Sequence, residues 1–484
     1  MNQPDGNLDA VIVGAGPNGL AAAVALQRAG ASVLVLEAAP AIGGSTRTVE
    51  LTLPGFHHDT CSAAHPMGIL SPFFRELPLA EHGLEWLQPQ ASVAHPLDDG
   101  PAVLLWRSLD RTADQLGRDG ANYRRLLEPL LRNPEVLMRD ILGPLGWPAA
   151  PLSFLRFGLR GLWPASWLAG TLFREEPARA LFAGNAAHAI LPLSQPMTAA
   201  FGLMFALAGH MEEWPVARGG SAAIATALAA LLQQEGGEIR TDCRVRTLAD
   251  LPAARVYLFD TDPRQLARIA GDALPSGYRR RLERFRYGPG VCKLDMALDG
   301  PIPWADARCA AASTVHVGGT LAEIAASEAA MWRGEHAERP FLIVVQQSSL
   351  DDSRAPEGKQ TGYAYCHVPA GSNVDMTERI EAQIERFAPG FRDRILARHT
   401  TTATDFAAIN PNLVGGAIGG GVADAAQLFT RPVARFDPYS TPNPRLFLCS
   451  ASTPPGGGVH GMCGYYAAQS ALRRLPGLRA GPLA

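Results

Sequence analysis

Residues 8–19 read Leu8-Asp9-Ala10-Val11-Ile12-Val13-Gly14-Ala15-Gly16-Pro17-Asn18-Gly19, and residues 33–37 read Val33-Leu34-Val35-Leu36-Glu37 after a stretch rich in alanine. Two apolar runs on either side of a glycine turn and a small-residue segment predict a strand, a helix and a second strand. The glycines allow a tight turn, and the start of the helix favours phosphate groups. Glu37 can accept hydrogen bonds from both ribose hydroxyls and would repel a 2′-phosphate. The stretch therefore predicts a dinucleotide-binding unit that does not select NADP.

A second pair of glycines follows in the run Ala38-Ala39-Pro40-Ala41-Ile42-Gly43-Gly44-Ser45-Thr46-Arg47. A domain that binds only NAD has no need of this pair. The run resembles the segment after the ribose-binding acid in the superfamily of FAD-containing amine oxidases and phytoene desaturases. In that superfamily the Gly-Gly backbone and the following arginine lie along the pyrophosphate and the flavin, so the resemblance implies these contacts for Gly43, Gly44 and Arg47. An ordinary loop turn with a solvated arginine is the alternative.

The C-terminal part of the chain contains another glycine loop. Residues 444–450 predict a buried strand, Pro454-Pro455-Gly456-Gly457-Gly458-Val459-His460-Gly461 follows it, and residues 465–472 predict a helix. In this superfamily the backbone N–H groups of such a loop face the pyrimidine edge of the flavin. A helix that begins there would stabilise reduced, anionic flavin.

Further segments extend the resemblance over the whole chain, at residues 215–220, 237–245, 410–416 and 427–432. The chain looks most like the phytoene-desaturase-like branch that contains the pyridine nucleotide-disulphide oxidoreductase domain-containing proteins. The resemblance implies an α/β fold. It combines a Rossmann-type FAD-binding domain, of the glutathione reductase and amine oxidase kind, with an interleaved α+β substrate domain.

The resemblance also implies that FAD is bound non-covalently, because no cysteine or histidine stands where the family would form a covalent link. In the family, the valine that corresponds to Val245 contacts the adenine through its backbone. The predicted cofactor-binding residues are Gly14, Gly16, Pro17, Asn18, Gly19, Glu37, Ala38, Gly43, Gly44, Ser45, Arg47, Val245, Gly457, Gly458, Val459 and Gly461.

The expected FAD-binding domain is discontinuous and takes residues 1–75, 215–290 and 406–484. The substrate-binding domain takes residues 76–214 and 291–405, in which the apolar runs 291–298 and 341–347 predict strands. The chain has 484 residues, of which 47% are hydrophobic, and can bury a core of this size.

Charge and cysteine usage argue against several classes of protein. The net charge is −3 and no basic run stands out, which argues against a nucleic-acid partner. The seven cysteines lack a Cys-x-x-Cys, so they predict neither a disulfide framework nor a redox dithiol. No cysteines and histidines have metal-ligand spacing, so no metal is expected. The polar leader, residues 1–7, resembles no signal or transit segment, and we expect a cytoplasmic protein.

Residues 186–211 come close to a membrane-spanning run, but two prolines and several polar residues interrupt it. A buried helix of the substrate domain is the main interpretation. The alternative joins this stretch to residues 151–173, where Trp163 and Trp167 stand among apolar residues and two arginines. Such a surface suits peripheral membrane contact and the delivery of an apolar small-molecule substrate.

Lys293 is the first candidate for catalysis, since a lysine inside an apolar strand is costly to bury. At the matching strand the amine oxidases carry a lysine that holds a water against flavin N5, and the resemblance implies the same role here. The alternative is that the strand turns Lys293 and Asp295 together to solvent. His460 is the second candidate, because its loop would place an imidazole beside the flavin, where it suits a proton acceptor.

Together these patterns predict an FAD-dependent oxidoreductase, a dehydrogenase, desaturase or oxidase. It would remove a hydride from a largely apolar or amphipathic organic substrate and form a C=C or C=N bond, with the flavin carrying the redox step. Two alternatives stay open. One is a redox-neutral isomerase of the carotenoid isomerase type, and the other is a flavin-loaded binding protein without turnover.

Overall fold

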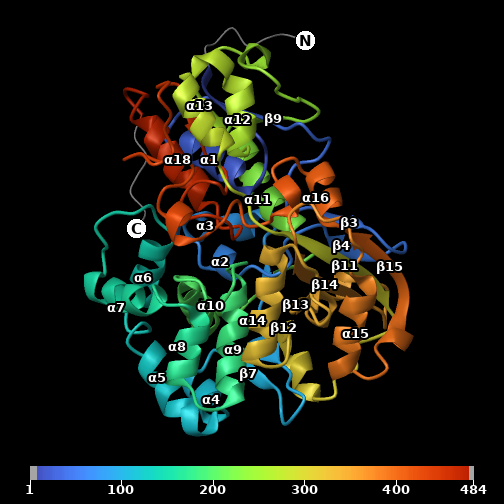
Figure 1. The fold of residues 1–484 in the computed structure, drawn as a ribbon. Coiled ribbons are helices and arrows are strands. Elements are labelled where there is room, and N and C mark those ends of the chain that lie inside the picture. Colours follow the sequence, from blue (N-terminus) through green and yellow to red (C-terminus); the bar gives the residue numbers. More distant parts are fainter. Residues whose placement is uncertain (1–7, 479–484) are drawn as a thin grey trace.

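The structure is a computed structural model that describes residues 8–478, so the polar leader lies outside the described residues (Figure 1). One sheet has five parallel strands in the order β16-β10-β1-β2-β9. Its strands are β1 (Leu8–Val13), β2 (Val33–Leu36), β9 (Glu238–Arg240), β10 (Ala254–Phe259) and β16 (Leu446–Leu448). Strands β2 and β16 are buried along their whole length, as expected for parallel strands covered on both faces. This sheet confirms the predicted Rossmann-type architecture.

A second, mixed sheet has seven strands in the order β15-β11-β14-β13-β12-β6-β7. Its strands are β6 (Ala91–His95), β7 (Val103–Leu105), β11 (Gly290–Leu298), β12 (Ala312–Val317), β13 (Leu342–Val345), β14 (Gln360–Val368) and β15 (Ile395–Thr401). Two small ribbons pair β3 (Thr48–Glu50) with β4 (His57–Asp59) and β5 (Trp86–Leu87) with β8 (Val216–Ala217). The strands predicted at 291–298 and 341–347 are β11 and β13.

Helices cover the sheets and form the lower left part of the molecule in Figure 1. Several of them have proline in the first turn, where the missing N–H has no intrahelical partner to lose. They are α1 (Pro17–Arg28), α2 (Pro66–Ile69), α3 (Pro72–Glu76), α4 (Leu109–Asp114), α5 (Gly120–Leu127), α6 (Pro134–Ile141), α7 (Pro151–Gly161), α8 (Ala165–Leu172), α9 (Glu176–Ala187), α10 (Thr198–Glu212), α11 (Ala222–Gln234), α12 (Pro263–Ala270), α13 (Ser276–Glu283), α14 (Leu321–Ala330), α15 (Thr377–Phe387), α16 (Ala403–Ile409), α17 (Ala425–Leu428) and α18 (Met462–Leu472).

The stretch 186–211 is not one continuous buried helix. It forms the end of α9, a loop that contains both prolines, and α10. The prolines lie in the loop because a proline inside a helix would remove a backbone hydrogen bond. Among the described residues, no helix combines the length and the apolar character that crossing a bilayer requires.

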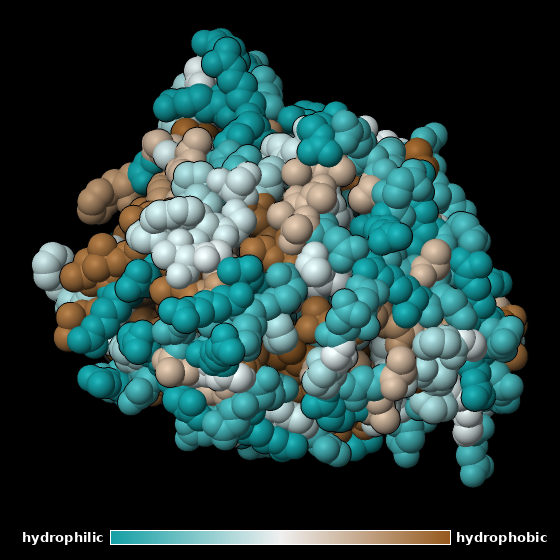
Figure 2. Space-filling view, turned by 60° about the horizontal axis from the view of Figure 1, so that its bottom comes forward, coloured by the Kyte–Doolittle hydropathy of each residue, from teal (hydrophilic) through white to brown (hydrophobic). Residues whose placement is uncertain are grey.

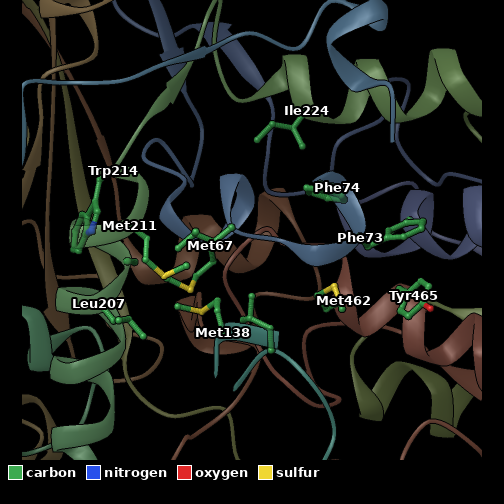
Figure 3. Packing of buried hydrophobic residues seen from close by; sticks show 14 of the residues in the cluster. Met67, Phe73, Phe74, Met138, Leu207, Met211, Trp214, Ile224, Met462 and Tyr465 are labelled. Atoms are coloured by element: carbon green, nitrogen blue, oxygen red, sulfur yellow. The ribbon is translucent and has the colours of Figure 1, made fainter. Parts of the chain in front are cut away.

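Helices α1 and α18 bring the N-terminal and C-terminal parts of the described chain together, and Figure 1 shows these helices side by side. A Cβ on Gly464 would lie 1.8 Å from the backbone oxygen of Asn18, so the helices can cross this closely only with glycine at that position. Beside the crossing, the rings of Phe73 and Tyr465 pack with centroids 4.9 Å apart (Figure 3). This packing holds the N-terminal glycine turn beside the C-terminal glycine loop.

Candidate active site

The two glycine segments of the N-terminal part meet at the carboxyl ends of β1 and β2. The N–H of Gly43 donates to the carbonyl of Ala15 over 2.9 Å, and a Cβ on Gly44 would lie 3.2 Å from the Cα of Gly16. The bare backbone of both segments lines a cleft of about 130 Å³. Among the predicted cofactor residues, this cleft is lined by Gly14, Gly16, Glu37, Ala38, Gly44, Arg47 and Val245. Val245 lies beyond β9, in a loop and not in the predicted strand.

Glu37 follows β2 directly and lies at the edge of this cleft. Its two carboxylate oxygens accept hydrogen bonds from the N–H groups of Ala15, over 2.8 Å, and Ala39, over 2.9 Å. These bonds orient the carboxylate and leave lone pairs free for ribose hydroxyls, because a carboxylate can accept about four hydrogen bonds. The glycine cradle and this acid therefore fit the adenosine and pyrophosphate part of a dinucleotide.

Asp260 is a residue of this cleft that the sequence analysis missed. It follows β10, and its Oδ2 accepts a hydrogen bond from the N–H of Gly19, near the start of α1, over 2.9 Å. Burial raises the pKa of the Asp260 carboxyl to about 7, the Gly19 N–H opposes this rise, and the charge of Glu37 adds to it. In the sequence, the position of this acid directly after the apolar run 254–259 could have indicated Asp260 as a site residue.

The titration of Asp260 predicts a pH dependence of FAD binding. FAD brings a negatively charged pyrophosphate to the glycine turn, which favours the protonated carboxyl, so binding above the pKa of about 7 requires uptake of a proton. We expect FAD affinity to be constant below pH 6 and to fall by up to about tenfold per pH unit above pH 7. Calorimetric titration of the flavin-free protein measures this profile.

The Asp260→Asn variant should flatten this pH profile, because its amide oxygen can still accept the Gly19 N–H but does not ionise. Asp352→Asn serves as the control, since the Asp352 side chain is 99% exposed. An unchanged slope in Asp260→Asn would show that another group takes up the proton.

A much larger cavity, of about 1560 Å³, has Ser45 in its lining. The C-terminal glycine loop forms part of its wall through Gly457, Gly458 and Val459. One face of the seven-stranded sheet forms another part, and the residues on that face are Thr314, Ile343, Val345, Tyr363, Tyr365 and His367. Helix α10 adds Phe201, Met204 and Phe205. The cavity therefore joins the predicted flavin edge to a mostly apolar chamber.

Some predicted cofactor residues line neither the nucleotide cleft nor the large cavity, and their contact with the cofactor stays a prediction. These residues are Pro17, Asn18, Gly19, Gly43 and Gly461. A Cβ on Gly19 would lie 2.0 Å from the carbonyl oxygen of Gly14, and one on Gly461 would lie 2.5 Å from the ring of Phe74. Both glycines are thus required by packing around the loops.

Lys293 is buried, and the alternative in which Lys293 and Asp295 face solvent is wrong: the residues are 1% and 0% exposed. The ammonium group forms an ion pair with the Asp295 carboxylate and lies 4.7 Å from the ring centroid of Tyr363. Burial lowers the pKa of the neighbouring His58 to about 3, with Lys293 adding to the effect. Lys293 lines neither space, and its predicted role beside the flavin stays a prediction.

His460 lines the large cavity but is 1% exposed. Its Nδ1 accepts the N–H of Met462 at the start of α18 over 3.0 Å, which places the proton of the neutral ring on Nε2. Burial lowers the pKa of His460 to about 4. The imidazole is therefore neutral at pH 7 and accepts the N–H of the first residue of α18, and its role as a proton acceptor stays a prediction.

Arg431 is a second residue that the sequence analysis missed. It is 2% exposed, lines the large cavity and donates to the carbonyls of Gly421 and Val422 over 3.2 and 3.1 Å. A Cβ on Gly456 would lie 2.6 Å from its Nη1. Burial lowers the pKa of Arg431 to about 10, and no carboxylate in residues 8–478 forms an ion pair with it. An unpaired cation at the glycine loop suits an anionic or electron-rich ligand.

Comparison with known proteins agrees with this architecture. Residues 12–77 match the family described as the NAD(P)-binding Rossmann-like domain. Over 96% of its length the chain is 28% identical to mouse (Mus musculus) pyridine nucleotide-disulfide oxidoreductase domain-containing protein 2, of which 94% is covered. A stretch of 28% of the chain is 33% identical to one of the subunits of limonene dehydrogenase from Castellaniella defragrans, covering 26% of that protein.

The fold is also that of a solved amine oxidase. Cyclohexylamine oxidase from Brevibacterium oxydans superposes with a TM-score of 0.57 at 17% identity, covering 97% of this chain and 100% of that chain. The family match, the mammalian relative and this fold confirm the resemblance that the glycine motifs indicated.

Proposed function

We propose that this chain, related along nearly its whole length to a mammalian oxidoreductase-domain protein, is an FAD-dependent oxidoreductase. Its reaction removes a hydride from a largely apolar or amphipathic organic substrate and forms a C=C or C=N bond. Bound FAD supplies the electron acceptor for this hydride. The cofactor is non-covalent, in agreement with the comparisons. Residues 1–75, 215–290 and 406–484 bind it, and the intervening segments bind the substrate.

The size and lining of the large cavity carry this proposal. Ligand pockets commonly have volumes of about 300–1,000 Å³, whereas this cavity measures about 1560 Å³ and so has room for a flavin ring and an organic substrate together. Its wall includes Ile343, Val345, Met204 and Phe205 beside the aromatic rings of β14. An apolar wall orients an apolar substrate by exclusion of water. The name of one relative, a subunit of a limonene dehydrogenase, agrees with an apolar substrate.

Different segments of the chain would bind the cofactor and the substrate. The glycine cradle with Glu37 holds the nucleotide part of the cofactor at the ends of the parallel strands. The loop 456–459 and Arg431 would supply backbone N–H groups and a positive charge to a flavin bound in the large cavity. The sheet face would hold the substrate in the same cavity, where its apolar side chains exclude water.

An anaerobic experiment tests the proposed function. Purified protein with bound FAD is mixed with NADH or NADPH, with dithionite, and with limonene as an apolar donor, while the visible flavin band is followed. We expect the band to stay with the nicotinamides and to bleach with dithionite and with the apolar donor class. Rapid bleaching by nicotinamides with no response to apolar donors would instead favour a reductase or a redox-neutral isomerase.

Peripheral contact with lipid is part of the proposal, because the cavity opens beside an apolar surface. The side chains of α7 include Leu155 and Leu159, which are 56% and 58% exposed, and Trp147 before α7 is 92% exposed. Figure 2 shows hydrophobic residues gathered on the side where Figure 1 places α6 and α7. Trp147 and Leu162 also line the cavity. An apolar substrate could then pass from the lipid into the cavity without crossing water.

The double variant Leu155→Glu/Leu159→Glu should weaken binding to vesicles of phosphatidylcholine and phosphatidylglycerol in a 3:1 ratio by at least tenfold. The reason is that a leucine contributes about 1.5–3 kcal/mol when it is transferred fully from water to an apolar environment such as lipid. Sedimentation with the vesicles measures this. Leu396→Glu on β15 is the matched control, since Leu396 is 48% exposed away from this surface. Equal sedimentation of both variants would contradict a role of α7 in lipid contact.

A further inference from the structure

His367, in the wall of the large cavity, forms a buried pair with Glu328 behind that wall, and the proposed function does not use the proton-binding groups of this pair. The Nδ1 of His367, on β14, lies 3.0 and 2.9 Å from the two carboxylate oxygens of Glu328, on α14. His367 is 5% exposed and Glu328 is 0% exposed. A carboxylate is costly to bury unless its partner compensates the charge, so this contact requires a reason.

The second ring nitrogen of His367 has no partner of its own. His367 lines the large cavity, and its Nε2 is buried without a hydrogen-bond partner within residues 8–478. Because the carboxylate of Glu328 accepts a hydrogen bond from Nδ1–H, the neutral ring carries its lone pair on Nε2. An unpartnered proton acceptor therefore lies in the wall of the cavity, with the Glu328 carboxylate on the other side of its ring.

The surroundings of His367 contain few other titratable groups. His188, at the end of α9, interacts electrostatically with His367, but burial lowers the pKa of His188 to about 3, so it stays neutral. Tyr365 lies on the same strand, with ring centroids 5.7 Å apart, and burial raises the pKa of its hydroxyl well above the usual range. In register on β11 stands Val291, which does not titrate. Glu328 is thus the charged group in direct contact with His367.

We propose that His367, oriented by Glu328, is the catalytic proton acceptor of this protein. The inference rests on the proposed function. Oxidation of H–C–X–H to C=X, where X is carbon or nitrogen, releases one hydride and one proton. The C–H bond breaks with its electron pair going to the flavin, and the X–H bond breaks with its proton forming a new N–H bond at Nε2. The carboxylate of Glu328 stabilises the resulting imidazolium.

Chemical mapping tests the dyad without turnover. Diethylpyrocarbonate modifies neutral imidazole nitrogens, and peptide mass spectrometry follows the modification of each histidine at one fixed pH in the FAD-loaded protein. We expect His367 to react and 1-decanol, as a cavity-filling probe, to protect it. In Glu328→Gln the rate of this reaction should fall several-fold, because the imidazole loses the negative charge that accepts from Nδ1–H and makes Nε2 a better nucleophile.

The matched control is Glu323→Gln on the same helix, where glutamine can keep the capping box with Thr320. This variant should leave the reaction rate of His367 unchanged. A His367 that fails to react, or a rate that does not fall in Glu328→Gln, would overturn the proposal.

Kinetics then test whether the pair of His367 and Glu328 acts in the reaction. In His367→Gln, bleaching of the flavin by a reactive donor should slow by at least about 10²-fold, while FAD content stays unchanged. A bleaching rate retained in His367→Gln would overturn the catalytic role. If no organic donor bleaches the flavin of the unmodified protein, the proposed function fails, and the mapping result still decides whether the dyad exists.

Discussion

Gly464→Ala should leave the protein almost free of FAD and markedly less stable. The added Cβ would lie 1.8 Å from the backbone oxygen of Asn18, and no rotation of a side chain can relieve an overlap with backbone. Helices α1 and α18 must separate, and α1 begins at the glycine turn of the nucleotide cleft. We expect a loss of about 3–5 kcal/mol, the range of the most damaging substitutions. Thermal melting at a fixed scan rate and the ratio of flavin to protein absorbance measure both effects.

A helical glycine without a close neighbour provides the control for this substitution. A Cβ on Gly170, in α8, would meet no atom within 4 Å. Gly170→Ala should keep the FAD content and raise stability by about 0.5–1 kcal/mol, because alanine has the higher helix propensity. If Gly464→Ala behaves like Gly170→Ala, the close crossing of α1 and α18 does not support the cofactor site.

Arg431→Met should slow reduction of the flavin by an organic donor by about 10²- to 10³-fold, the effect of removing one group that stabilises developing negative charge. The guanidinium is buried at the glycine loop without a carboxylate partner in the described part of the chain, so its charge is available to a reduced, anionic flavin. Methionine has a similar length and tolerates burial, which limits damage to the fold. Anaerobic stopped-flow measurement of bleaching gives the rate.

A second readout separates electrostatics from structure in this variant. The midpoint potential of the bound flavin, measured by equilibration with a reference dye, should fall in Arg431→Met, because the reduced form loses a stabilising cation. Arg431→Lys should recover part of the potential, since the charge stays while one carbonyl contact is lost. An unchanged potential in Arg431→Met would show that Arg431 acts only by holding the carbonyls of Gly421 and Val422.

Local patterns predicted the elements of this protein well. The alternation of apolar runs and glycine turns predicted β1, β2, β11, β13 and β16, because strand and turn preferences depend on neighbours in the chain. The same patterns located both glycine loops of the site. Boundaries were less exact where packing decides them: α18 begins at Met462, three residues before the predicted Tyr465.

The sequence by itself therefore determined the fold class and the nucleotide cleft, since these reside in short contiguous motifs, and the resemblance of those motifs to the superfamily indicated FAD. Only the tertiary structure decided which distant side chains share a space. It placed Asp260 against the first glycine turn, Arg431 against the last, and Glu328 against His367. It also buried Lys293, whereas the alternation of side chains along a strand is equally compatible with a lysine that faces solvent. The physical reason is that burial and pairing depend on the packing of the two sheets and their helices, and no local pattern records which residues that packing brings together.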